Sequence, residues 1–277
     1  MVLNLLFPQW QGSGTTNELY SGAMLIYDLL QQLAEFETVP VRSTQELNIE
    51  RNILGYSSII QNLLSAKKII QQYNPSRIFV IGGDCGVDVA PISFLDRKYD
   101  GDLAVVWLDA HGDLNTPSTS PSKHFHGMPL RVLLGEGDEQ IINLSFSKLH
   151  PKQVFIVGAR DFDPPETSYL KQEKISLFSP QTIENNPRQL IDAIAKTDYN
   201  QLYIHFDLDV IDPSYFPFVK CPASNGLSIE AIGSLLQKLQ SNFNIVGFSI
   251  TESAAASKSD LEIIDSILNL TQKIMSK

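Results

Sequence analysis

The sequence predicts an α/β fold in which helices cover both faces of a mostly parallel sheet. Three observations predict it: short apolar runs alternate with amphipathic helical segments, polar residues follow directly after these runs, and no linker rich in glycine, serine or proline divides the chain. Strands that alternate with helices favour parallel βαβ units. With 277 residues, of which 43% are apolar, the chain is long enough for one large core. We therefore expect a single domain over residues 1–277.

The strands are predicted from short apolar runs that end in glycine or polar residues. The run Arg77-Ile-Phe-Val-Ile-Gly82 shows the pattern: it is apolar after its arginine, and Gly83-Asp84-Cys85 follows. A parallel strand that is buried on both faces has this composition. About eight strands are expected in this way, over residues 2–7, 38–41, 77–82, 103–108, 153–158, 175–178, 201–206 and 244–250.

The helices are predicted from apolar residues that recur every three or four positions. In the segment 18–36, the positions that share one helical face are Ala23, Ile26, Leu29, Leu30 and Leu33. The next helical segment stops near Asn74-Pro75, because the residue before a proline disfavours the helical conformation. The predicted helices include residues 18–36, 55–73, 187–195, 228–240 and 260–275.

Charge and cysteine content narrow the expected partners and compartment. The net charge of −10 reflects 31 acidic against 21 basic residues without a basic cluster, so nucleic acids and anionic membranes are not expected partners. Two cysteines, Cys85 and Cys221, are too few for a disulfide framework, which fits a reducing compartment. The apolar run at residues 1–8 lacks a basic segment and is too short for a signal peptide or membrane span. We expect a soluble, cytoplasmic protein.

The strand at residues 103–108 is followed by three side chains that can bind metal, Asp109, His111 and Asp113. Residues two apart in an extended chain point the same way, so these groups can converge on one small volume. Two carboxylates so close together raise each other's pKa unless a cation compensates. The motif therefore indicates a metal site, although it also fits a strand that ends in a polar turn.

Polar residues after the other strands favour the metal site. Ligands of open α/β sheets bind beyond the carboxyl ends of the strands, where this sequence places at least seven carboxylates. Asp207 and Asp209 follow the strand at 201–206, as Asp109 and Asp113 follow theirs. Four carboxylates and a histidine exceed the needs of one ion, so we expect two ions that share ligands. Oxygen-rich ligation suits Mn²⁺, and a water between two such ions is acidified, so hydrolysis is the expected reaction.

Four motifs follow one another between residues 80 and 252: Gly82-Gly-Asp84-Cys85, Asp109-Ala-His111-Gly-Asp113-Leu-Asn115-Thr-Pro117, His126-Gly-Met-Pro129 and Asp207-Leu-Asp209-Val-Ile-Asp212-Pro213. Together they resemble the ureohydrolase family, which includes arginase and agmatinase. The resemblance implies an arginase-like, three-layer α/β/α fold with a central, parallel, eight-stranded sheet. This fold agrees with the number of strands predicted above.

The resemblance also implies a role for each matching residue, around a binuclear centre of two Mn²⁺ ions per chain. His126 matches the active-site histidine that is proposed to pass a proton to the leaving amine. Glu252 matches the acid that holds the guanidinium, a group that stays charged and pairs well with a carboxylate. The implied catalytic residues are His126, Asp113 and Glu252. The implied metal ligands are Cys85, Asp109, His111, Asp113, Asp207 and Asp209.

The segment Gly158-Ala-Arg160-Asp161-Phe-Asp163-Pro164 looks more like arginase than agmatinase. In arginases, the acid at the position of Asp163 helps to bind the α-amino group of the substrate, so an amino-acid substrate is favoured. Lys123 and His124 depart from the family pattern, because they replace the usual Gly-Asn. The implied substrate-binding residues are Asn115, Ser122, Asp161, Asp163 and Glu252.

Cys85 is the largest departure, because the family has a histidine ligand at this position. A thiolate is a softer donor with a negative charge, which would weaken Mn²⁺ binding there or favour other ions. The alternative is a buried cysteine that binds no metal while water completes the coordination. The substitution resembles a branch of the family that includes N-hydroxyarginine hydrolases. Cys221 is expected in the core or the pocket wall.

We therefore expect a binuclear-manganese hydrolase that converts arginine or N-hydroxyarginine to urea or hydroxyurea plus ornithine. The alternatives are agmatinase, guanidinobutyrase or formiminoglutamase activity, or a metal-poor, non-catalytic family member with a binding role. Retention of both aspartate pairs, His126 and Glu252 argues against the last alternative. The expected partner is a small guanidino compound, and the resemblance implies a homotrimer or homohexamer.

Overall fold

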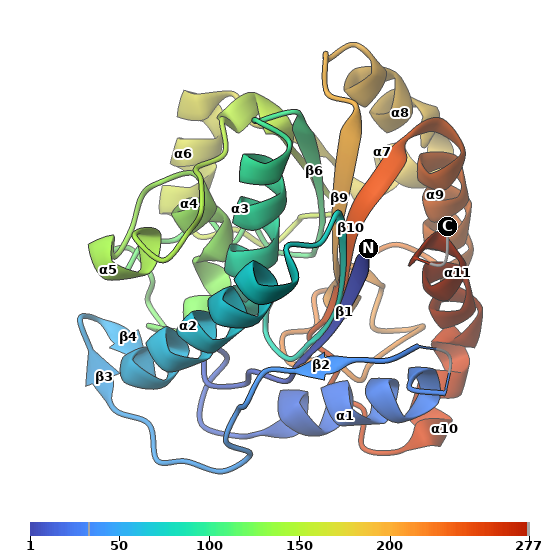
Figure 1. Ribbon diagram of the computed structural model, residues 1–277. Coiled ribbons are helices and arrows are strands. Elements are labelled where there is room, and N and C mark those ends of the chain that lie inside the picture. Colours follow the sequence, from blue (N-terminus) through green and yellow to red (C-terminus); the bar gives the residue numbers. More distant parts are fainter. Residues whose placement is uncertain (33, 276–277) are drawn as a thin grey trace.

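The computed structural model, which describes residues 1–32 and 34–275, is organised around one eight-stranded sheet (Figure 1). Every strand pair in this sheet is parallel, as predicted. The order across the sheet is β2-β1-β5-β10-β9-β6-β7-β8. The strands are β1 (Val2–Phe7), β2 (Glu37–Thr38), β5 (Arg77–Gly82), β6 (Leu103–Leu108), β7 (Val154–Val157), β8 (Ser176–Phe178), β9 (Gln201–Asp207) and β10 (Asn244–Thr251).

Helices cover both faces of the sheet, which confirms the three-layer α/β/α architecture (Figure 1). Successive residues of a strand point to opposite faces, so Trp107 packs in one core and Val106 in the other. This is why the central strands are apolar throughout. The first face is covered by α2 (Tyr56–Tyr73), α3 (Val89–Lys98), α4 (Pro129–Leu133), α5 (Glu139–Ile142) and α6 (Pro164–Glu173). The second is covered by α1 (Glu18–Leu30), α7 (Pro180–Asn185), α8 (Arg188–Ala195), α9 (Ile229–Asn242), α10 (Lys258–Leu261) and α11 (Asp265–Met275).

The strand boundaries agree with the prediction at residues 77–82 and 103–108 and differ at the edge of the sheet. The strand predicted at 38–41 is β2, which covers only Glu37–Thr38. Val39 still donates its N–H to the Leu6 carbonyl at 2.9 Å. Pro40 follows and has no N–H, so the pairing ends there.

A small hairpin at the surface was not predicted. Its strands, β3 (Ile49–Glu50) and β4 (Ile53–Leu54), pair in the antiparallel direction. Arg51 and Asn52 form the turn, and their φ values of 51° and 60° lie in the left-handed region that a two-residue hairpin turn requires. Two strand residues on each side gave too short an alternating pattern to recognise in the sequence.

Two predicted helices are shorter than expected. The helix predicted over 18–36 ends at Leu30, because the chain must then turn to place Glu37 beside β1. Leu33, which the spacing predicts on the apolar face of this helix, lies outside the described residues. The helix predicted over 260–275 is divided into α10, a 3₁₀ turn (Glu262–Ile264) and α11. Ser257 caps the first part, so the helical segment begins at Lys258.

The strand order brings the predicted site residues together. β10 is the last strand of the chain, yet it lies between β5 and β9 in the middle of the sheet. The carboxyl ends of β5, β10, β9 and β6 are therefore neighbours at one edge. Cys85, Glu252, Asp207 and Asp109 follow or end these strands in that order. Two 3₁₀ turns, η1 (Cys85–Asp88) and η4 (Leu208–Val210), redirect the chain there.

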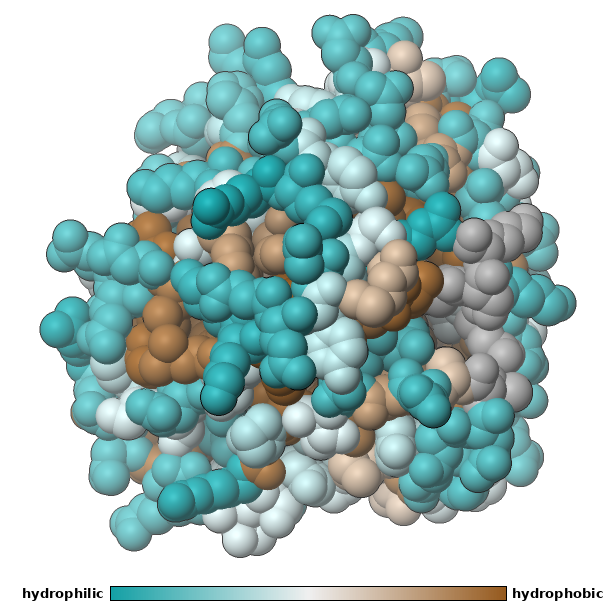
Figure 2. Space-filling view, viewed as in Figure 1, coloured by the Kyte–Doolittle hydropathy of each residue, from teal (hydrophilic) through white to brown (hydrophobic). Residues whose placement is uncertain are grey.

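The face of the molecule in Figure 2 is mainly hydrophilic, with hydrophobic residues in small, separate areas. The exposed large hydrophobic side chains are spread over several elements: Met1, Val2, Ile49, Leu64, Leu177, Tyr215 and Ile263. In the described parts of the chain, no helix combines the length and the apolar character that crossing a bilayer requires.

Candidate metal centre and active site

All six predicted metal ligands lie at the sheet edge where β5, β10, β9 and β6 end. Together with His205 and Glu252, they form three groups, and the donor atoms of each group lie within 4.8 Å of one another. Because Asp109 and Cys85 each belong to two groups, the edge can hold two ions that share ligands. The groups are Asp109 with His111 and Asp209, Cys85 with Asp207 and Glu252, and Cys85 with Asp109, Asp113 and His205.

Three aspartates of the centre each use one carboxylate oxygen to hold the backbone. Oδ1 of Asp109 accepts from the His111 N–H at 2.6 Å, and Oδ1 of Asp207 accepts from the Asp209 N–H at 2.7 Å. Oδ1 of Asp209 accepts from the Ala110 N–H at 3.0 Å, which joins the ends of β6 and β9. The second oxygen of Asp209 lies 3.0 Å from Nδ1 of His111. These backbone bonds orient the carboxylates toward the shared centre.

The centre concentrates acidic side chains that are almost completely buried. Asp109, Asp113 and Asp207 are each no more than 4% exposed. Burial, followed by the charge of neighbouring acids, raises the pKa of Asp113 and Asp207 well above the usual range. Asp109 differs: although burial opposes ionisation, the nearby imidazoles of His111 and His205 lower its pKa. Buried acids whose ionisation is opposed by burial and by one another favour the binding of a cation, which offsets their charge.

Unpartnered polar atoms show that the residues fit a metal centre. Among the residues that the structure describes, Oδ2 of Asp113, Oε2 of Glu252 and Nε2 of His205 are buried without a hydrogen-bond partner. Such atoms cost free energy unless another group binds them. Carboxylate oxygen and imidazole nitrogen are donors that Mn²⁺ accepts. Bound cations would therefore satisfy atoms that the protein leaves free.

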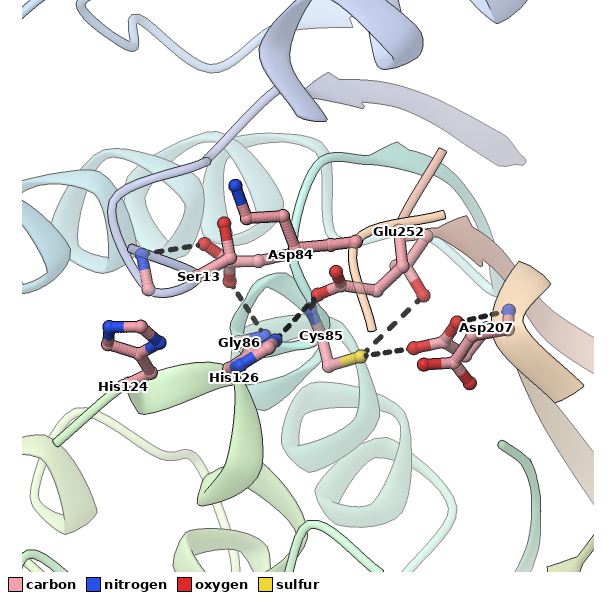
Figure 3. Close-up of polar contacts among 12 residues, drawn as sticks. Ser13, Asp84, Cys85, Gly86, His124, His126, Asp207 and Glu252 are labelled. Carbon is pink, nitrogen blue, oxygen red and sulfur yellow. Dashed lines mark hydrogen bonds and ion pairs between the residues drawn. The ribbon is translucent and has the colours of Figure 1, made fainter. Parts of the chain in front are cut away.

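Cys85 lies inside this centre rather than at its margin. Its side chain is almost completely buried, and its Sγ lies 3.0 Å from Oδ2 of Asp207 (Figure 3). Burial, then the charge of Asp207, raises the pKa of the thiol well above its usual value. Without a cation, the group therefore stays protonated and donates to Asp207. A coordinated metal ion deprotonates a thiol, so ion binding would convert Cys85 to an anionic donor.

His126 and Glu252 form a pair beside Cys85. Nδ1 of His126 lies 3.2 Å from Oε1 of Glu252, which also accepts from the Cys85 N–H at 3.2 Å (Figure 3). The N–H of His126 donates to the Gly12 carbonyl at 3.0 Å, so the loop after β1 helps to place this histidine. Burial favours a neutral imidazole, but the charge and hydrogen bond of Glu252 outweigh it and raise the pKa of His126. The contact with Glu252 therefore favours the protonated form of His126.

The backbone at two of the site's carboxylates is strained. Asp113 has φ of 52° and Glu252 has φ of 63°, both in the left-handed region that residues other than glycine seldom adopt. Each such residue costs on the order of 1 kcal/mol or more, and they concentrate at functional sites. The strain aims both carboxylates at the centre, and both retain an unpartnered oxygen among the described residues.

A cavity of about 140 Å³ adjoins the metal centre. Three predicted substrate-binding residues, Asn115, Ser122 and Asp163, line it together with several of the metal ligands. Nδ2 of Asn115 donates to Oδ2 of Asp163 at 2.8 Å, so the amide and the acid form one polar unit. Cys221 also lines the cavity, as predicted, and is a free thiol. A molecule in this cavity can reach the centre and the polar unit at the same time.

Of the other two predicted substrate-binding residues, Glu252 does not line this cavity but contacts two residues that do, Cys85 and His126, and Asp161 lies outside it. The side chain of Asp161 is exposed and lines a separate surface depression together with Arg160 and Pro180. The N–H groups of Arg160 and Asp161 both donate to the Ala110 carbonyl, at 2.8 and 3.1 Å, which sets the direction of this turn. Asp163, two residues later, caps α6 and faces the cavity.

Glu166 is a buried acid of the site that the sequence did not reveal. It lines the cavity, and its Oε1 accepts from the Leu114 N–H at 2.8 Å. Its Oε2 accepts from the Asp163 N–H at 2.9 Å, which completes the capping box of α6. The spacing Asp163-Pro-Pro-Glu166 is the signal that could have identified this cap. Glu166 thus fixes the loops that carry Asp113 and Asp163.

Asp84 is a second buried acid to which the sequence assigned no role. Its carboxylate accepts from the N–H of Gly86 at 2.9 Å (Figure 3). It also accepts from the N–H of Gly12 and from Nε2 of Gln9, both at 2.9 Å. Burial, then the charge of Glu252, raises the pKa of Asp84 to about 7. Asp84 ties the loop after β1 to the turn that carries Cys85.

The fold and the site together define an α/β enzyme with a candidate binuclear metal centre at the carboxyl edge of a parallel sheet. Residues 20–270 match the model of the Arginase family. An arginase of Staphylococcus aureus (strain MSSA476) is 30% identical over 226 residues, which cover 77% of this chain and 73% of that arginase. An arginase of Bacillus subtilis (strain 168) is 33% identical over 196 residues, which cover 68% of this chain and 64% of that protein.

Solved structures show the same fold. The crystal structure of Entamoeba histolytica arginase in complex with L-ornithine matches with a TM-score of 0.87 at 23% identity and covers 98% of each chain. Formimidoylglutamase from Bacillus subtilis matches with a TM-score of 0.74 at 16% identity, covering 99% of this chain and 86% of that one. The chain belongs to the arginase family and is a ureohydrolase. The family is known for a binuclear metal centre, and the buried acids and histidines described above could hold one here.

Proposed function

We propose that this ureohydrolase is a manganese enzyme that hydrolyses a linear guanidino amino acid, arginine or N-hydroxyarginine, to urea or hydroxyurea plus ornithine. The observation that carries the proposal is the composition of the cavity. It begins at Cys85, Asp207 and Asp209 and extends to Asn115 and Asp163. A guanidino amino acid carries its reacting cation at one end and its amino and carboxylate groups at the other, so it matches both ends.

The proposed ligands of two Mn²⁺ ions are mostly carboxylates, which suits this metal. Bound manganese would activate water for attack on the guanidinium carbon and would offset the charge of the buried acids. The unpartnered Oδ2 of Asp113 supports its assignment both as a ligand and as a catalytic residue. The proposed set is Cys85, Asp109, His111, Asp113, Asp207 and Asp209.

Glu252 is proposed to hold the guanidinium. Its Oε2 is buried without a partner among the described residues, while Oε1 is already occupied by Cys85 and His126. A free carboxylate oxygen in a buried site pairs strongly with a guanidinium N–H. Binding there places the guanidinium carbon beside the metal ligands. The pairing also explains why a carboxylate is kept in a strained backbone conformation.

His126 is proposed to give its proton to the leaving amine. The nitrogen that leaves must be protonated, because an amide anion is a poor leaving group. His126 lines the cavity, and its contact with Glu252 raises its pKa and so favours the protonated form. The same contact fixes the ring, so the proton donor and the residue that binds the guanidinium are positioned together.

At the other end of the cavity, Asp163 is proposed to bind the α-amino group, and Asn115 and Ser122 the α-carboxylate. The hydrogen bond from Asn115 to Asp163 keeps the acid and the amide donor side by side. An amino acid carries an ammonium and a carboxylate on one carbon, so its binding site needs a hydrogen-bond acceptor and a hydrogen-bond donor side by side. Agmatine has no carboxylate, so this end of the cavity favours an amino acid.

N-hydroxyarginine is the second candidate, and Cys85 is the observation that favours it. The thiol replaces the usual imidazole directly beside Glu252, at the end where the guanidinium would lie. This is where an added hydroxyl group on the guanidino nitrogen would be accommodated. A non-catalytic, metal-poor protein is disfavoured, because it would leave the buried oxygens of Asp113 and Glu252 unsatisfied.

The test is product identification with manganese-loaded protein on arginine, N-hydroxyarginine, agmatine, guanidinobutyrate and formiminoglutamate. Urea or hydroxyurea plus ornithine, with two Mn²⁺ ions per chain by elemental analysis, is the expected result. Turnover of agmatine or guanidinobutyrate alone would reject the amino-acid substrate. If none of the five compounds is hydrolysed by protein that contains manganese, the proposed chemistry is wrong.

A further inference from the structure

His205 is a buried histidine next to the proposed centre that has no role in the family pattern described above. It lies in β9 two residues before Asp207, so both side chains point to the same face of the sheet. It is completely buried and pairs in register with Trp107 of β6. The two rings stack with their centroids 3.6 Å apart and an angle of 17° between their planes. The stacking holds the imidazole in one orientation.

The hydrogen bonds of His205 determine which nitrogen carries its proton. Nδ1 lies 2.6 Å from Oδ2 of Asp88, at the end of η1. The same carboxylate accepts hydrogen bonds from the hydroxyl groups of Tyr203 and Ser249. Asp88 therefore acts as an acceptor on both oxygens, and Nδ1 of His205 is a donor. A carboxylate that holds one ring nitrogen in this way orients the other nitrogen of a metal-binding histidine.

The other nitrogen, Nε2, faces the metal ligands and has no hydrogen-bond partner among the described residues. It lies 3.8 Å from Oδ2 of Asp109, too far for a hydrogen bond. Two donors that each lie about 2.1 Å from one metal ion can be up to about 4.2 Å apart, so this separation allows an ion between them. Donor atoms of Cys85, Asp109, Asp113 and His205 all lie within 4.8 Å of one another.

We propose that Nε2 of His205 is a ligand of the metal ion that Cys85, Asp109 and Asp113 hold. In this chain, β9 would supply the imidazole that the family usually supplies at the position of Cys85. A neutral nitrogen donor is added without further negative charge, which suits a centre already rich in carboxylates. The inference rests on the proposed function, because it assumes that the centre binds Mn²⁺.

The direct test is the number of imidazoles bound to manganese in the wild-type protein. Pulsed electron paramagnetic resonance of Mn²⁺-loaded protein detects the nitrogens of coordinated imidazoles. Two imidazoles per chain, His111 and His205, are expected. A single imidazole would overturn the inference, and it is the result expected if Nε2 of His205 only approaches Asp109 from outside the coordination sphere.

Two variants test whether one of the coordinated nitrogens belongs to His205. His205→Asn keeps an N–H donor toward Asp88 but removes Nε2, so it should lose one coordinated nitrogen and weaken one Mn²⁺ site at least about 10-fold. His150→Ser is the matched control, because His150 caps a 3₁₀ turn outside the site and its replacement should leave the nitrogen count unchanged. An unchanged count in His205→Asn contradicts the proposal. If this variant does not fold, a crystal structure of the manganese-loaded wild type decides: an Nε2–metal distance of about 2.1 Å supports the assignment, and one above about 3 Å refutes it.

The outcomes separate this inference from the proposed function. Protein that binds two Mn²⁺ ions and hydrolyses a guanidino amino acid, but shows one imidazole, refutes only the role of His205. Protein that binds no manganese refutes both. Protein with two coordinated imidazoles that acts on another substrate upholds the inference and rejects the proposed substrate.

Discussion

The thermal stability of this protein should depend strongly on Mn²⁺, and the dependence should increase with pH. The perturbation is removal of divalent metal with a chelator. Two sites, each saturated at about 100 times its Kd, stabilise the folded state by about 5 kcal/mol in total. For a domain of this size, each kcal/mol changes Tm by about 2 °C, so loading should raise Tm by roughly 10 °C.

The pH dependence follows from the raised pKa values of Asp113 and Asp207 in the metal-free protein. Each is higher in the folded than in the unfolded state, where it is about 4. The contribution of such a group to stability is complete below the unfolded pKa and is lost as the pH rises through the folded pKa. The Tm of the metal-free protein should therefore decrease as the pH rises from 5 to 8. Bound manganese stabilises the ionised acids, so the gain in Tm should be largest at pH 8.

The assay is thermal unfolding, followed by circular dichroism, from pH 5 to pH 8 with chelator or with excess Mn²⁺. Asp109→Asn should lose most of the manganese effect, because Asp109 belongs to two of the ligand groups. Asp161→Asn is the control and should retain it, because Asp161 is exposed outside the cavity. Equal Tm values with and without manganese at pH 8, or a metal-free protein more stable at pH 8 than at pH 5, would refute the reasoning.

Three further predictions concern activity and metal binding. Cys85→His restores the usual family ligand and should raise Mn²⁺ affinity at least about 10-fold in metal titrations. If neither the affinity nor the substrate preference changes, Cys85 is not a metal ligand. Glu252→Gln should keep its manganese but lose at least about 100-fold in kcat/KM, since removing one partner of a buried charge pair costs about 2–5 kcal/mol; a loss below tenfold would exclude its binding of the guanidinium. Asp163→Asn should raise KM at least about 10-fold while Asp161→Asn changes it less than about twofold, and equal effects in steady-state kinetics would reject the assignment of the amino-group site.

The local chemistry of the centre was predictable from the sequence because alternation along strands is a local property. Asp109, His111 and Asp113 were recognised as converging ligands, and the structure brings all three to the centre. Residues two apart in a strand point to the same face, so the position of Asp207 also predicts that the side chain of His205 faces the centre. His205 lies within an otherwise apolar run, however, and such a run predicts a buried strand rather than a ligand.

Features that depend on distant contacts were not predictable in this way. Asp161 and Asp163 have the same spacing as other ligand pairs, but only Asp163 faces the cavity. The difference arises because the Ala110 carbonyl, from another strand end, accepts from the N–H of Asp161 and sets the turn. Likewise, periodicity predicted β10 but not its place between β5 and β9.

The central place of β10 has a consequence for the biosynthesis of the enzyme. Cys85 and Glu252 are neighbours in space but 167 residues apart in the chain. While the ribosome is still making residues 244–251, β5 and β9 lack their shared partner, and both edges are open to mispairing. Glu252 arrives only with that final strand. The sheet edge that carries the site is therefore completed only after β10 is synthesised, and a truncated polypeptide that ends before β10 would lack both the strand between β5 and β9 and the carboxylate of Glu252.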